Sequence, residues 1–523
     1  MNDFPWLSTL GLLPFVGAAV VAFVPKGRET LAKQIALGFS LVVLAVTVAM
    51  ALQFDASASA PFQFVESHVW IKQFGISYAL GVDGIALVLI ALLTSLVPVV
   101  ILAGWHDADT GRHSVQTYFA LFLALEGTVV FVFATTDLFL FYVAFEVMLL
   151  PVYFLIGMFG GAQRTYAAVK FLLYSLFGGL ILLAGLISLY VISAQQLPHG
   201  TFDVTALAGL SIDPTTQKWL FAAFFFAFAV KAPMFPVHTW LPDAAAAGTP
   251  GTNTLVVGVL DKVGTFGMIR LCLPLFPDAS QWAAPFVVAL AAFSVVYAGL
   301  VAIGQTDMNR IVAYVSVSHF GVIVLGIFAF TTLGGSGSTF YMVAHGLSAA
   351  ALFLIVGFLV RRRGSAQIGD FGGVARVAPM LAGVFLAAGL SSLAMPGMAG
   401  FVGELTSLVG SFPRWPGAAV VSVLGIVLSA LYILQMYKRV AQGPKTDQVS
   451  SFVDLGPREA WVVAPVLALT IALGVFPQPI FDVVNPAVDR ILEQVSAPVI
   501  EPSVSALSTA LSTPASGTEG AQP

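Results

Sequence analysis

Several titratable side chains lie within long apolar stretches of the sequence, where charged groups are otherwise rare. They are Glu126, Glu146, Lys231, Asp261, Lys262, His319, His345 and Glu404. Inside a bilayer each ionised group costs at least about 2.5–3.5 kcal/mol, so these groups are expected to face the interior of a helix bundle. A static ion pair that fixes helix packing is the alternative for any single residue. Acids, lysines and histidines together favour a relay that hands protons from group to group.

The stretch around Lys231 carries the strongest local signal. Its prolines are Pro233, Pro236 and Pro242. Pro233 and Pro236 cannot donate to the carbonyl groups four residues before them, so the helix is expected to break here. Free carbonyls at membrane depth are tolerated only where they line a cavity or water, which predicts a hydrated break beside Lys231. His238, nearer the end of this stretch, is either a secondary proton-path residue or a helix anchor.

Similar features surround two carboxylates. Pro151 follows Glu146 and predicts a bend one turn after the acid. Pro396 precedes Glu404 and predicts a second broken helix. Broken helices at corresponding places in two halves are typical of inverted-repeat transporters. Glu126, which has no charged neighbour in sequence, is either a secondary path residue or a protonated, hydrogen-bonded core group.

Asp261, Lys262, His319 and His345 lie between these two breaks along the chain. Neighbouring residues of a helix point about 100° apart, so Asp261 need not be the partner of Lys262. Asp261 is a secondary proton-path candidate. We interpret the two histidines as stepping stones beyond Lys262, because histidine exchanges its proton near physiological pH. The alternative for each is a histidine that is simply satisfied within the core.

The composition excludes a water-soluble globule. Hydrophobic residues make up 58% of the 523 residues and charged residues only 9%, whereas soluble domains contain about 25% charged residues. The net charge of −4 does not indicate nucleic-acid binding. The single cysteine, Cys272, excludes an internal disulfide and a cysteine-ligated cluster within this chain. The remaining class is an all-α polytopic membrane protein.

Apolar runs of about 20 residues, the length that crosses the hydrocarbon, number about fourteen. They are centred near Val16, Val43, Leu93, Leu125, Met148, Leu182, Phe226, Met268, Ala292, Val322, Leu352, Phe385, Val427 and Leu467. No basic segment precedes the run from Trp6 to Val24, so we expect a retained first helix and not a cleaved signal. Spans 4–8 and 9–13 are expected to form two inverted five-helix repeats, with spans 7 and 12 broken.

Most lysine and arginine residues gather in the connections that follow odd-numbered spans. The other side carries Lys72, Lys218, Arg270, Arg414 and Arg490 in loops and the tail. The positive-inside rule therefore predicts cytoplasmic odd-numbered connections and both termini outside. The expected organisation is three helices in residues 1–110, the repeats in 111–275 and 276–440, a last helix in 441–490 and a disordered tail in 491–523.

The sequence contains no glycine-rich dinucleotide fingerprint, no phosphate-binding loop of the Walker type and no paired-cysteine motif. No pair of candidate ligands has the spacing of a usual metal site. We therefore expect no cofactor and no metal in this chain. If the chain belongs to a redox enzyme, electron transfer takes place outside this chain.

Several motifs together resemble the antiporter-like proton-pumping subunits of respiratory complex I. The motifs are Asp137–Phe139 with Glu146 and Pro151, Lys231–Ala244, Ser316–Gly321 and Gly400–Glu404. The resemblance extends over nearly the whole chain, and multisubunit cation/proton antiporters share its Lys-Ala-Pro and Trp-Leu-Pro-Asp-Ala pieces. The fourteen spans, and an acid at Glu404 where sister subunits often carry lysine, favour the M type found in bacterial NADH–quinone oxidoreductase.

This resemblance implies roles for individual residues. Glu146 resembles the acid that pairs with Lys231, Lys262 the central lysine, His319 and His345 the connecting histidines, and Glu404 the acid on the exit side. Two positions differ from the family pattern. Ala245 stands where the family usually has a histidine, and Asp261 precedes Lys262.

The resemblance also implies a multi-pass protein of the bacterial plasma (inner) membrane. Its expected partners are the lipid bilayer and other membrane-arm subunits of complex I, especially the L-type and N-type antiporter-like subunits, and not nucleic acid. NADH, FMN, iron–sulfur clusters and quinone are then expected in other subunits of the complex.

The expected function is proton translocation driven by quinone reduction elsewhere in the complex. A proton would pass Lys231, Lys262, the two histidines and Glu404, with waters between them. Pairing of Glu146 with Lys231 would be the switch, because a paired lysine keeps its charge whereas a desolvated, unpaired one gives up its proton. The alternatives are a subunit of a multisubunit sodium/proton antiporter and a scaffold that connects other subunits without pumping.

Overall fold

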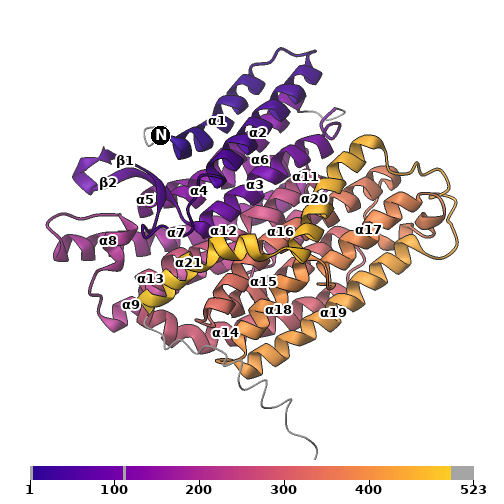
Figure 1. Cartoon of the computed structure of the whole chain (residues 1–523). Coiled ribbons are helices and arrows are strands. Elements are labelled where there is room, and N and C mark those ends of the chain that lie inside the picture. Colours follow the sequence, from indigo (N-terminus) through magenta and orange to yellow (C-terminus); the bar gives the residue numbers. More distant parts are fainter. Residues whose placement is uncertain (1–3, 110–112, 496–523) are drawn as a thin grey trace, which may run out of the picture.

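The structure is a computed structural model that describes residues 4–109 and 113–495. Most of its elements are helices that run side by side in one bundle (Figure 1). The first helices, α1 and α2, lie at one side of this bundle and α19 lies at the opposite side. The fold therefore places the middle of the chain, which carries the candidate site, between its two ends.

The bounds of the elements follow the chain in order. They are α1 (Trp6–Ala22), α2 (Glu29–Ala51), β1 (Gln63–Ile71), η1 (Lys72–Phe74), β2 (Ile76–Val82), α3 (Gly84–Ala103), α4 (Val115–Ala134), α5 (Leu138–Val147), α6 (Leu149–Phe159), α7 (Arg164–Gln196), α8 (Val204–Ala208), α9 (Pro214–Lys231), α10 (Trp240–Ala247), α11 (Pro250–Leu255), η2 (Val256–Leu260), α12 (Lys262–Gly267), η3 (Met268–Cys272), α13 (Leu273–Leu275), α14 (Pro277–Ile303), α15 (Met308–Ile327), α16 (Thr332–Arg363), η4 (Ile368–Asp370), η5 (Val374–Arg376), α17 (Pro379–Ser392), α18 (Ala399–Ser411), α19 (Pro416–Ala441), α20 (Pro457–Val475) and α21 (Gln478–Val495).

Ten described helices are long and apolar enough to cross a membrane, or up to eleven if one bent pair counts as a single span. The other predicted spans are short or interrupted. Prolines divide α9 from α10 and α17 from α18, and the π-helical turns η2 and η3 interrupt the helix from α11 to α13. The polytopic helical class is therefore clear, whereas the count of fourteen and the inverted repeats stay predictions.

A short antiparallel hairpin makes the description as all-α incomplete. Strands β1 and β2 pair with each other, with Glu66 opposite Leu80 and His68 opposite Tyr78. The hairpin joins α2 to α3, and its residue Ala79 accepts a hydrogen bond from the backbone of Thr136. We call this end of the bundle the hairpin end.

The C-terminal region also differs from the expected single last helix. Residues 457–475 form α20, and α21 follows directly and contacts α3, α13, α14 and α16. In Figure 1, α21 runs across the direction of the bundle. The helix is amphipathic: its apolar residues occupy one face, and the other face carries polar side chains such as Asp482 and Glu493. Since α21 continues to Val495, the expected tail does not begin at 491, and residues 496–523 lie outside the described residues.

Ion pairs join the helix ends opposite the hairpin. The Lys33 ammonium lies 2.5 Å from Asp109, and that of Lys170 lies 2.7 Å from Asp243. Arg310 also pairs with Asp243. One basic residue departs from its expected loop position. Arg270 lies in η3, is buried and pairs with Asp83 at the start of α3.

Candidate functional site

The central feature of the bundle is a row of buried titratable side chains on α12, α15, α16 and α18. The Lys262 ammonium lies 2.7 Å from Nδ1 of His345. The ring of His345 meets the ring of His319 edge-on, with centroids 5.3 Å apart. All three side chains are buried. The structure thus brings together three of the residues that the sequence singled out.

Tyr341 extends this row to Glu404. Its ring centroid lies 5.6 Å from that of His319, and its hydroxyl donates to Glu404 Oε2 at 3.2 Å. Tyr341 and Glu404 are both buried. Sequence reasoning missed Tyr341, although it stands four residues before His345 and therefore on the same face of a helix.

A π-helical turn positions Lys262. In η2 the backbone departs from α-helical pairing, and the carbonyl of Val257 accepts a hydrogen bond from the Lys262 ammonium. Such π-bulges are frequent at functional sites. The aromatic ring of Phe320 lies 5.2 Å from the same ammonium. The lysine is therefore held by a carbonyl, a histidine and an aromatic face, and not by a carboxylate.

Lys231 is the last residue of α9, where the predicted break begins. Its ammonium donates to the hydroxyl of Ser175 on α7 at 3.3 Å. The rings of Phe145 and Phe171 lie 5.2 and 5.3 Å from it. Sequence reasoning missed Ser175, and no sequence signal marks it, because only the packing of α7 against α9 places it there.

The structure does not join Glu146 to Lys231 as an ion pair within 4.0 Å, and Glu146 Oε1 has no hydrogen-bond partner in the described chain. The Glu146 carboxylate instead lies against Gly179 of α7, where an added methyl group would overlap it. Gly179 and Ser175 are four residues apart on α7, which places the contacts of Glu146 and Lys231 on one face, about 6 Å apart along the axis.

The three secondary candidates have different surroundings. Asp261 is buried beside Lys262, and neither of its oxygens has a hydrogen-bond partner among the described residues. Glu126 is buried on α4, and its carboxylate is likewise unpartnered among the described residues. His238 lies in the first break between the rings of Phe235 and Tyr297, with centroids 6.0 and 5.4 Å away.

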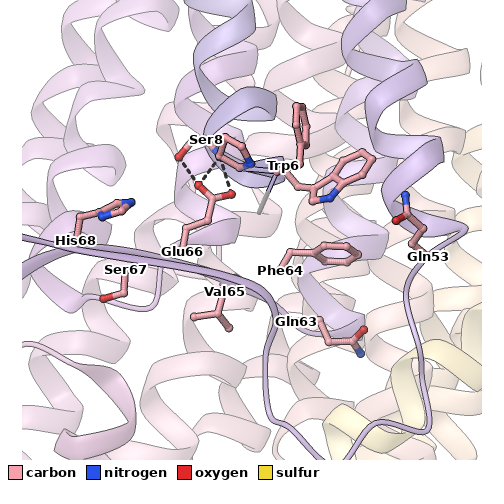
Figure 2. A pocket seen from close by; sticks show the side chains of 11 residues that line it. Trp6, Ser8, Gln53, Gln63, Phe64, Val65, Glu66, Ser67 and His68 are labelled. Carbon is pink, nitrogen blue, oxygen red and sulfur yellow. Dashed lines mark hydrogen bonds between the residues drawn. The ribbon is translucent and has the colours of Figure 1, made fainter. Parts of the chain in front are cut away.

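A cavity of about 660 Å³ lies at the hairpin end (Figure 2). Figure 2 shows Glu66 of β1 reaching the start of α1, where its carboxylate accepts from the backbone N–H groups of Leu7 and Ser8. This contact satisfies the free N–H groups of a helix start. Within residues 4–109 and 113–495, no group of three or more His, Cys, Asp or Glu side chains has the arrangement of a metal site.

These features define a class: a helical membrane protein with broken spans and a buried, connected row of lysine, histidine, tyrosine and glutamate. A family model described as "NADH:quinone oxidoreductase/Mrp antiporter, TM" matches residues 135–429, which contain the whole row. The chain is 49% identical to NADH-quinone oxidoreductase subunit M of Mycobacterium tuberculosis, over 96% of this chain and 97% of the relative. The chain therefore belongs to the family of subunit M of NADH-quinone oxidoreductase, which confirms the resemblance found in its motifs.

Solved structures share the fold. A chain of respiratory complex I from Thermus thermophilus superposes with a TM-score of 0.85 and 27% identity, covering 94% of this chain and all of that chain. A chain of the Mrp complex from Dietzia sp. DQ12-45-1b superposes with a TM-score of 0.81 and 23% identity, over 94% of this chain and all of that chain. The second likeness shows the fold alone.

Proposed function

We propose that this chain is the proton-translocating membrane subunit, of the M type, of a bacterial NADH:quinone oxidoreductase. The observation that carries the proposal is the connected, buried row from Lys262 through His345, His319 and Tyr341 to Glu404. Buried polar atoms are normally hydrogen-bonded. The unpaired ring nitrogens of His319 and His345 along this row therefore offer sites to bridging waters.

The row supports transfer of protons and not of electrons. A protonated Lys262 gives a proton to His345 Nδ1, and the two rings and the Tyr341 hydroxyl carry protons on to the Glu404 carboxylate. Lys231 and Lys262 are buried, and aromatic rings lie 5.2 Å from each ammonium, so little water reaches either group. Moving one charge against 100 mV costs about 2.3 kcal/mol.

Glu146 is the proposed switch for Lys231. The carboxylate rests against Gly179 in this structure, one helical turn along α7 from the serine that holds the lysine. A shift of about one turn would bring the two charges together and keep the lysine protonated. Neighbouring subunits would bias that shift as quinone is reduced elsewhere in the complex.

The remaining parts of the proposal concern topology and assembly. Fourteen spans with two inverted repeats, both termini on the outer side of the bacterial plasma membrane, and L-type and N-type subunits as neighbours follow from the motifs and the positive-inside rule. The two broken spans, α9–α10 and α17–α18, support the repeats. Cysteine labelling of Lys72 and Arg376 variants from either side of the membrane tests the orientation.

The central test is Lys262→Ala in the assembled complex. We expect the proton-pumping rate of membrane vesicles supplied with NADH to fall by about tenfold or more, because positioned proton carriers contribute factors of this order or larger. Asp447→Asn, which changes an exposed acid in the loop before α20, is the control and is expected to pump normally. Undiminished pumping in Lys262→Ala, with quinone reduction intact, contradicts the proposal and favours a scaffold.

An antiporter subunit is the second candidate, because the description of the matching family model also names the Mrp antiporter. Purified chain in liposomes distinguishes the two. Sodium-driven proton movement by the isolated chain would support the antiporter, whereas co-purification with redox subunits in mild detergent would support the first proposal.

A further inference from the structure

Asp261 is a buried acid whose position the row does not yet explain. Its side chain is 1% exposed, and both carboxylate oxygens lack a hydrogen-bond partner within the described residues. Burying a polar group without a partner costs free energy, so such groups in a folded protein call for an explanation. The surroundings of Asp261 supply one.

Asp261 lies on the face of its helix that meets the end of α9. Gly264, three residues later and thus on the same face, approaches α9 so closely that an added methyl group would lie 2.5 Å from Ala232 N and from Phe228 O. Ala232 directly follows Lys231. The missing side chain of Gly264 therefore lets the two helices meet, and Asp261 lies one turn away on the side of Lys231.

Lys262 points away from that contact. Its ammonium binds His345 on α16 and the Val257 carbonyl. These adjacent residues thus face different sides of their helix. Asp261 faces the end of α9, which carries Lys231, and Lys262 faces the histidines. Asp261 directly precedes Lys262, and its face of the helix meets the last turn of α9, which ends at Lys231.

Two lysines need an acceptor between them. A charged ammonium donates three hydrogen bonds and accepts none, so Lys231 cannot pass its proton to a charged Lys262 and is repelled by it. A carboxylate accepts hydrogen bonds and attracts both ammonium groups. Glu146 does not fill this place, because it lies against Gly179 on α7.

We propose that Asp261 carries the proton from Lys231 to Lys262; this inference rests on the proposed function and refines it. An N–H bond of the Lys231 ammonium breaks as an O–H bond forms on the Asp261 carboxylate, which leaves a neutral amine and a carboxylic acid. That O–H bond then breaks as the neutral amine of Lys262 takes the proton, and the carboxylate is restored.

The test is Asp261→Asn in the assembled complex, compared with Asp261→His, Lys262→Ala and the control Asp447→Asn. We expect Asp261→Asn to assemble and to lose pumping by about tenfold or more, as Lys262→Ala does, because asparagine keeps the shape but carries no proton. Asp261→His is expected to regain part of that activity, since it restores a proton carrier. A static counter-ion predicts the reverse order, because histidine removes the negative charge and can add a positive one.

The outcomes separate the two proposals. Normal pumping in Asp261→Asn with loss in Lys262→Ala overturns the role of Asp261 and leaves the proposed function standing. Normal pumping in both contradicts the proposed function itself. If neither Asp261 variant yields assembled complex on native gels while Asp447→Asn does, Asp261 has a structural role and the inference is wrong.

Discussion

The two broken spans, α9–α10 and α17–α18, differ in how far the rest of the chain covers their irregular backbone. The first break is enclosed by protein: Phe235 N donates to the Ser294 hydroxyl at 3.0 Å, and the Trp240 indole donates to the Val230 carbonyl at 2.9 Å. The second break has the same kind of backbone bond as the first: Met395 N donates to Leu390 O at 3.1 Å, as Met234 N does to Ala229 O at 3.0 Å. It is the more open of the two. Its residues 395–397 are exposed.

The helices before the two breaks also start differently. Asp213 caps α9 from the adjacent position and accepts from the N–H groups of Thr215 and Thr216 at 3.0 and 3.1 Å. The start of α17 is bound by Asp454, from the loop before α20, which accepts from Met380 and Leu381 at 3.0 and 2.9 Å. The first broken span is thus locally specified, whereas the second depends on distant parts of the chain.

This difference bears on function. Irregular backbone at membrane depth is tolerated only where protein or water covers it. The first break meets this condition within the chain, and so keeps Lys231 in a fixed setting. The exposed second break leaves a surface that a neighbouring subunit of the membrane arm is expected to cover.

The largest expected effect of a single methyl group is at the first break. Gly264→Ala places a carbon 2.5 Å from backbone atoms of α9, and overpacking of this kind costs about 1–3 kcal/mol. We expect less assembled complex and a lower apparent unfolding temperature in detergent. Gly383→Ala on α17, where an added methyl group meets open space, is the control. Equal stability of the two variants would show that the first break is not tightly enclosed.

The next largest effect is expected at Tyr341, which links His319 to Glu404 near the second broken span. Tyr341→Phe removes the hydroxyl that donates to Glu404, which leaves a gap in the row, and we expect pumping to fall several-fold. Tyr190→Phe removes the hydroxyl of a tyrosine on α7 whose ring stacks on Phe202, outside the row, so its pumping should be unchanged. Similar losses in both variants would argue against a specific link through Tyr341.

A smaller effect is expected from the serine that holds Lys231. Ser175→Ala removes one hydrogen bond of about 1 kcal/mol, whereas the rings of Phe145 and Phe171 remain. We expect pumping to fall a few-fold, less than in Tyr341→Phe. Ser422→Ala is the control, since this buried hydroxyl has no partner in the described part of the chain. A loss larger than that of Tyr341→Phe would show that the serine contact of Lys231 matters more for pumping than the contact of Tyr341 with Glu404.

The smallest expected effect is the pH dependence of the contact between the Asp454 carboxylate and the start of α17. Burial raises the pKa of Asp454, but the N–H groups of Leu381, Met380 and Leu455 lower it by more, so this pKa lies below its usual value. A lowered folded-state pKa stabilises the fold above the ordinary aspartate pKa of about 3.9 and loses that contribution as the pH falls through the folded value.

Asp454→Asn should therefore lower the apparent unfolding temperature at pH 7, and its difference from the parent chain should shrink at about pH 3. Asp447→Asn, in the same loop, is the control for a change of surface charge. A difference between Asp454→Asn and the parent chain that is the same at both pH values would show that the carboxylate charge does not stabilise α17.

Much of the class and of the site was accessible from sequence, because membranes penalise buried charges. Lys231, Lys262, His345 and Glu404 were recognisable as polar residues in apolar runs, and the break after Lys231 followed from prolines. The length of α20 and the start of α21 were not, since an amphipathic helix after a proline has no long apolar run. Arg270 was predicted to lie in a loop. Its partner Asp83 is 187 positions away, so no local pattern indicated a buried ion pair.

What the sequence determined by itself was the set of groups able to hold protons, since the cost of burying a charge selects residues by type and depends little on their partners. What only the tertiary structure decided was their order and contacts: that Tyr341 links His319 to Glu404, that Ser175 holds Lys231, and that Asp261 and Lys262 face opposite ways. Those contacts join separate helices, and helix packing, which no local pattern records, sets their distances.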